Sequence, residues 1–124
     1  MWSCVTGERS VETLAVKINV KGEVVSAYLS GDLDHHSAGM IREAIDAAIE
    51  LNMPSLLVLD FSGVSFMDSS GIGLVMGRFR NLQRTGAGLH ITGTSPQIYK
   101  IMKLSGIERL AKLDIGGFKV ENNQ

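Results

Sequence analysis

Serine, aspartate and histidine side chains that could take part in chemistry gather in two segments of the sequence. The first is Gly31-Asp32-Leu33-Asp34-His35-His36-Ser37, and the second is Asp68-Ser69-Ser70-Gly71-Ile72-Gly73. A serine beside an aspartate can serve as a nucleophile, accept a phosphate or lie at the start of a helix that the aspartate caps. The spacing of the surrounding residues decides among these roles.

The spacing does not match the common catalytic and cofactor motifs. A nucleophile elbow needs glycine two residues before the serine, but Met67 and Asp68 stand two residues before Ser69 and Ser70. No Gly-Lys-Ser/Thr is present, so a P-loop is absent, and the glycines at 71, 73 and 77 miss the dinucleotide spacing. We therefore predict a non-enzyme without a cofactor. A small hydrolase that uses Ser69 or Ser70 with a histidine remains as an alternative.

The first segment also contains groups that bind metals. Asp32, Asp34, His35 and His36 could gather around a cation, but adjacent histidines point apart on a helix or a strand, and no Cys/His set supports them. The favoured interpretation is a polar connector from Gly31 to His36, with Asp34 or Ser37 capping the following helix. The sequence thus predicts no metal site.

The second segment suits phosphorylation. Serine hydroxyls at a helix N-terminus lie near backbone N–H groups and the positive end of the helix dipole, which tolerate a phosphate. A phosphoserine would add about −1.5 to −2 charges beside Asp68 and repel an acidic or apolar partner without a change of fold.

The glycines that follow are costly, because each glycine inside a helix loses about 1 kcal/mol relative to alanine. Gly73 and Gly77 are four residues apart and share one helix face. Close packing onto a sheet and access for a partner surface both explain them.

Hydrophobic periodicity predicts the elements that position these segments. Residues 14–20 and 23–30 alternate as strands joined by a turn at Lys21-Gly22, and residues 55–61 form a nearly continuous apolar strand. Apolar stripes predict helices, the second of them with Ile72, Val75, Phe79 and Leu82 buried. The helices are expected at residues 37–51, 69–84 and 96–104, and two further strands at 89–92 and 110–115. The order β-β-α-β-α-β-α-β predicts an α/β fold with a mixed, mostly parallel sheet that begins with an antiparallel hairpin.

Length and composition limit the remaining possibilities. A chain of 124 residues forms one domain, and 12 basic against 13 acidic residues give no support for binding to nucleic acid. Arg78, Arg80 and Arg84 are interpreted as a solvated helix face. One cysteine, no secretory signal and no long apolar segment predict a cytoplasmic protein that does not bind membranes.

Together the two segments resemble the STAS domain of bacterial anti-sigma factor antagonists, also called anti-anti-sigma factors. The similarity covers about residues 11–115 and includes Leu57-Val58-Leu59-Asp60-Phe61, Met76-Gly77-Arg78-Phe79-Arg80 and Leu104-Ser105-Gly106-Ile107. Residues 1–10 are expected to be an N-terminal arm and residues 116–124 a C-terminal tail. Because this tail is short and starts with two glycines, it puts in doubt the further C-terminal helix that such proteins usually have.

The resemblance implies a function and a site. It implies that the unphosphorylated protein binds an anti-sigma factor that is a serine kinase, which then releases its sigma factor. The kinase would phosphorylate Ser70, and a serine phosphatase would reset the switch. The implied partner-binding residues are Asp34, His35, Asp68, Ser69, Ser70, Gly71, Ile72 and Gly73. The alternative is a non-enzymatic STAS subunit of a larger signalling or lipid-transport complex.

Overall fold

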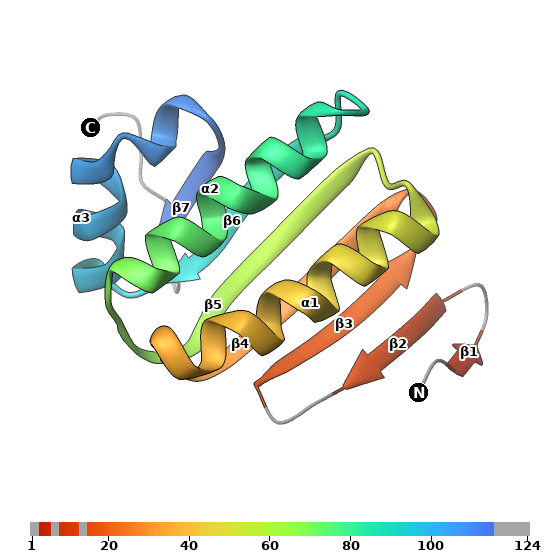
Figure 1. Ribbon diagram of the computed structural model, residues 1–124, viewed down its shortest axis with the longest axis horizontal. Coiled ribbons are helices and arrows are strands. Elements are labelled where there is room, and N and C mark those ends of the chain that lie inside the picture. The colour runs from red at the N-terminus through yellow and green to blue at the C-terminus, as the bar shows by residue number, and fades with distance from the viewer. Residues whose placement is uncertain (1–2, 6–7, 13–14, 116–124) are drawn as a thin grey trace.

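The computed structural model describes residues 3–5, 8–12 and 15–115. Its strands form one seven-stranded sheet in which each strand pairs with the next along the chain (Figure 1). They are β1 (Ser3–Val5), β2 (Glu8–Glu12), β3 (Val16–Lys21), β4 (Val24–Leu33), β5 (Leu56–Met67), β6 (Gly88–Thr94) and β7 (Lys112–Ile115). The helices are α1 (His35–Asn52), α2 (Ser69–Gln83) and α3 (Pro96–Ser105), followed by a 3-10 turn, η1 (Ile107–Arg109).

The order predicted from the sequence is confirmed from β3 to β7. β3 and β4 form the antiparallel hairpin around Gly22, whose φ of 59° suits a tight turn, and β4 to β7 pair in parallel. A parallel pair needs a crossover, and α1, α2 and α3 provide the three crossovers.

The core lies between the sheet and the helices. α1 and α2 lie side by side across one face of the sheet (Figure 1). The side chains of both helices that face the sheet are buried. The largest fully buried side chains come from all parts of the domain: Ile18, Leu29, Leu33, Ile41, Ile45, Ile49, Leu57, Leu59, Phe61, Leu82, Ile91 and Met102.

Three predicted boundaries are wrong, because strand pairing extends beyond the apolar sequence. Instead of an arm without regular structure, the first residues contribute β1 and β2, and β2 pairs with β3 through its backbone. β4 continues through Gly31 to Leu33 and α1 already starts at His35, so half of the connector expected from Gly31 to His36 is strand and its last two residues are helix. β5 continues beyond the strand predicted at 55–61 and reaches Met67, since its ladder with β4 persists past two register shifts. The tail at 116–124, with the question of a C-terminal helix, lies outside the described residues.

The second helix also differs from its predicted pattern. Leu74, Val75 and Leu82 are buried, but Ile72 and Phe79 are only half-buried. Arg78 is 6% exposed, whereas Arg80 and Arg84 are exposed as predicted. The interpretation of all three arginines as a solvated face is therefore wrong for Arg78, which faces α1.

Candidate functional site

The parallel pairing of β4 and β5 brings the two polar segments together. The pairing ends at Leu33 and Met67, so both strands finish at the same edge of the sheet. Each is followed by one capping residue and then a helix, and the N–H of Asp68 donates to the carbonyl of Leu33 at 3.2 Å. The N-termini of α1 and α2 are therefore neighbours although they are 34 residues apart in the sequence (35 against 69).

Asp34 caps α1, one of the two interpretations that the sequence left open. Its Oδ1 accepts from the N–H groups of His36 at 2.9 Å and Ser37 at 3.1 Å, and the N–H of Asp34 donates to Ser37 Oγ at 3.1 Å. The bond from the Ser37 backbone is the largest cause that lowers the pKa of Asp34 below its ordinary value of 3.8. Asp34 is thus fixed as a charged cap, and no group of three or more metal-ligating side chains occurs among the described residues.

Asp68 caps α2 in the same way. Its Oδ1 accepts from the N–H of Ser70 at 2.8 Å. Ser69 and Ser70 therefore occupy the first turn of the helix, where the dipole favours negative charge. Ser69 is exposed and Ser70 is half-buried.

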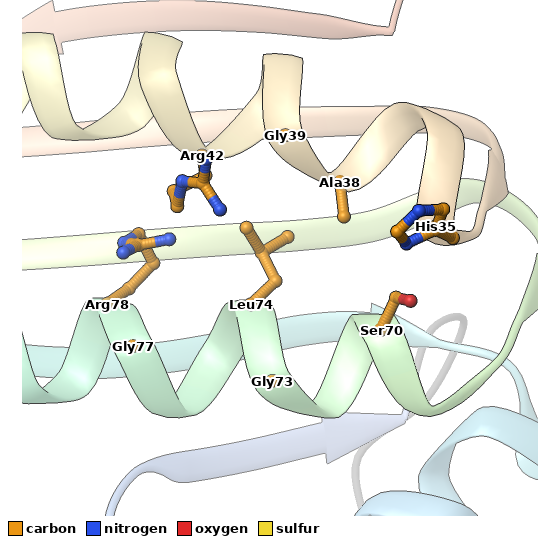
Figure 2. Close-up of a pocket in the computed structure, with 9 residues that line it drawn as sticks. All are labelled: His35, Ala38, Gly39, Arg42, Ser70, Gly73, Leu74, Gly77 and Arg78. Atoms are coloured by element: carbon orange, nitrogen blue, oxygen red, sulfur yellow. The ribbon is translucent and has the colours of Figure 1, made fainter.

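The side chain of Ser70 faces a groove between the two helices (Figure 2). The groove has a volume of about 460 Å³. His35, Ala38, Gly39 and Arg42 line it from α1, and Ser70, Gly73, Leu74, Gly77 and Arg78 line it from α2. We call this space the interhelix groove. His35 and Ser70 lie on opposite sides of one end (Figure 2), but no hydrogen bond joins Ser70 Oγ to a histidine in the part of the chain described here.

The glycines of α2 have two different roles. A Cβ on buried Gly71 would overlap the Met67 side chain and lie 3.2 Å from Leu33 Cδ2, so this glycine allows close packing. A Cβ on Gly73 or Gly77 would meet no atom within 4 Å. Packing onto the sheet therefore explains Gly71 only, and Gly73 and Gly77 instead leave the interhelix groove open.

The predicted site residues thus divide into three groups. His35, Ser70 and Gly73 line the interhelix groove, with Ser69 exposed beside it. Asp34 and Asp68 hold the helix starts, and Gly71 and Ile72 pack toward the core. Sequence reasoning singled out Gly77 as a costly glycine that could give a partner access, but it missed Gly39, Arg42 and Arg78 as neighbours of this site. The available signal was a glycine inside each helix followed closely by an arginine.

Arg78 and Arg42 give the groove its positive charge. Nε of Arg78 lies 2.8 Å from Oδ1 of Asp46, so the two side chains form an ion pair between α2 and α1. Burial is the main cause that lowers the pKa of Arg78, and the charge of Arg42 lowers it further, while Asp46 raises it.

Two helices that begin side by side at the end of a parallel strand pair, with a serine in the first turn of α2, place this chain among the α/β domains with a mixed sheet. A family model described as the STAS domain matches residues 15–117. The chain belongs to the STAS domain family.

Particular relatives narrow the comparison. The chain is 40% identical over 88 residues to an anti-sigma F factor antagonist of Lysinibacillus sphaericus. The aligned region covers 71% of this chain and 75% of the relative. Among solved structures, it resembles the anti-sigma factor antagonist SpoIIAA in its unphosphorylated form, with a TM-score of 0.71, 35% identity and coverage of 80% of this chain and 87% of the other. The phosphorylated form of SpoIIAA, a Bacillus cell fate determinant, matches with a TM-score of 0.65, 35% identity and coverage of 80% and 90%.

Proposed function

We propose that this protein is an anti-sigma factor antagonist that is controlled by phosphorylation of Ser70. In its unphosphorylated form it binds an anti-sigma factor, which is also a serine kinase, and so releases the sigma factor. Phosphate on Ser70 switches this binding off, and a serine phosphatase restores it. The protein itself is a non-enzymatic module of the cytoplasm, and ATP is a substrate of its partner.

The observation that carries this proposal is the position of Ser70. Its hydroxyl lies in the first turn of α2 and faces the interhelix groove, within a helix start that Asp68 and the ladder between β4 and β5 hold in place (Figure 2). The dipole of α2 tolerates a phosphate here. The similarity to antagonists, one of which is known in unphosphorylated and phosphorylated forms, supports the same switch.

Charge accounts for the loss of binding. A phosphate would add about −1.5 to −2 charges to a surface that already has Asp68 and Asp34 at its edge. An acidic or apolar partner surface would be repelled, and the helices would not have to move. No helix among the described residues is long and apolar enough to span a membrane.

The direct test is phosphorylation by the cognate anti-sigma factor with ATP, followed by peptide mass spectrometry. We expect phosphate on Ser70 in the wild type and in Ser69→Ala, but none in Ser70→Ala. In calorimetry, Ser70→Asp should bind the kinase about tenfold or more weakly, as expected for a like charge at an interface, and Ser70→Ala should bind but resist release by ATP.

Other outcomes would reject specific parts of this proposal. Phosphate on Ser69 alone would reject the assignment of the site, and equal affinities of Ser70→Asp and Ser70→Ala would reject the charge mechanism. Stable copurification with a large scaffold or a transport complex, without binding to the anti-sigma factor, would favour the alternative of a structural STAS subunit.

A further inference from the structure

The interhelix groove is kept open by three glycines that the fold itself does not require. A Cβ on Gly39, Gly73 or Gly77 would meet no atom within 4 Å, and none of these residues has a positive φ. Alanine would therefore fit at each position and would favour the helix over glycine. The space between α1 and α2 is available to a group from outside the domain.

The groove also holds more positive than negative charge, because two arginines line it and one carboxylate is paired with them. Arg78 is 6% exposed, and its Nη1 is buried without a hydrogen-bond partner among the residues that the structure describes. Arg42 faces the same groove from α1 (Figure 2). Within the described ranges, Asp46 is the one carboxylate in ion-pair contact with either arginine. A buried polar group without a partner is unfavourable, so two guanidinium groups with a single carboxylate favour the entry of another anion.

We propose that the interhelix groove receives an acidic side chain of the anti-sigma factor, which inserts between α1 and α2 and pairs with the guanidinium groups of Arg42 and Arg78. This inference rests on the proposed function, because it names how that partner is recognised. Walls without side chains let the partner backbone approach closely enough for a short Asp or Glu side chain to reach the arginines. A carboxylate also matches the planar donor pattern of a guanidinium group.

The same groove connects recognition to the switch. Ser70 lines the end that lies next to His35, and the two arginines line the other part (Figure 2). A phosphate on Ser70 would place negative charge at the entrance used by the acidic side chain. Repulsion between the phosphate and the partner's carboxylate then weakens binding, although the phosphate does not cover either arginine.

The test measures the affinity of the purified anti-sigma factor for four variants alongside the wild type, with thermal unfolding of each. Arg42→Ala should weaken binding by about ten- to a hundredfold, because it removes one partner of a charge pair, and should leave the melting temperature unchanged. Gly77→Ala should weaken binding by a similar factor while raising the melting temperature. A simple loss of folding cannot produce that combination.

Two controls repeat the chemistry outside the groove. Arg80→Ala removes an exposed arginine from α2, and Gly88→Ala adds a Cβ at a position in β6 where its nearest neighbours are at ordinary contact distances of 3.5 and 3.9 Å. Both controls should bind within about twofold of the wild type, as expected for substitutions outside an interface.

The outcomes separate this inference from the proposed function. If the wild type binds the anti-sigma factor and Arg42→Ala and Gly77→Ala bind equally well, the groove inference is wrong and the proposed function stands. If the wild type does not bind, both are rejected. Tight binding of inorganic phosphate to the free protein, with amide shifts at Arg42 and Gly77 in NMR spectra, would assign the groove to a small anion and also overturn the inference.

Discussion

At the scale of single residues, the glycines of α2 show how one residue type serves two purposes within three positions. Gly71 is buried against Met67 and Leu33, so its missing side chain makes room for the core. Gly73 is exposed, with no neighbour for a Cβ to touch. The sequence indicates that these glycines are costly, but only the direction of each Cα–Cβ bond tells the two purposes apart.

Alanine at position 71 should therefore destabilise the protein. The new Cβ would overlap the Met67 side chain and force it or the start of α2 to move. We expect Gly71→Ala to lower the free energy of unfolding by about 1–3 kcal/mol, the usual range for overpacking, as measured by urea denaturation. A double-mutant cycle with Met67→Ala should show a favourable coupling of about 1 kcal/mol or more. Wild-type stability of Gly71→Ala would contradict this packing role.

At the scale of elements, the helix ends were the most predictable part of the molecule. Asp34, Asp68 and Ser95 cap α1, α2 and α3, and Gly106 ends α3 with a φ of 86°. These features depend on residues within a few positions of one another, which a single sequence displays directly. That Ser70 would lie at a helix N-terminus follows from the same local pattern.

Features that depend on distant pairing were not predictable. β2 is recognised only by its backbone bonds to β3, and the extension of β5 to Met67 depends on its ladder with β4. The burial of Arg78 depends on α1, whose Asp46 is 32 positions earlier in the chain (78 − 46). Periodicity along one helix cannot show that its polar face lies against another helix.

The contact between α1 and α2 gives a prediction at this scale. Oδ1 of Asp46 lies 2.8 Å from Nε of Arg78 and accepts from Nδ2 of Asn81 at 2.9 Å. Asp46→Ala would leave buried Arg78 without its counterion. We expect a loss of about 3 kcal/mol in the free energy of unfolding, at the lower end of the range for buried pairs, because the Asp46 side chain is 37% exposed.

The matched control uses the exposed pair of the same two helices. Nη2 of Arg84 lies 3.6 Å from Oε1 of Glu50, and the two side chains are 56% and 74% exposed. Glu50→Ala should change the free energy of unfolding by less than about 0.5 kcal/mol. Equal effects of the two substitutions in urea denaturation would show that Asp46 does not compensate a buried charge.

At the scale of the whole molecule, the proposed switch lies on a rigid support. The starts of α1 and α2 are both fixed to the ends of paired central strands, and the core beneath them is continuous from β3 to α3. A helix held at its N-terminus in this way has no evident route for transmitting a large movement from Ser70. Phosphorylation of Ser70 is therefore expected to control partner binding by changing the charge of the domain surface, with the helices left in place.

Phosphorylation should accordingly leave the fold and its stability nearly unchanged. The dipole of α2 favours a phosphate on Ser70 by about 0.3–1 kcal/mol, and repulsion from Asp68 opposes it. We expect the free energy of unfolding to change by less than about 1 kcal/mol as a result. Two-dimensional NMR spectra should show amide shifts at the starts of α1 and α2, with the amides of β3, β6 and α3 unaffected. Shifts throughout the sheet, or a large drop in melting temperature, would mean that the phosphate acts by altering the fold, and the charge on the surface would then no longer explain the loss of binding.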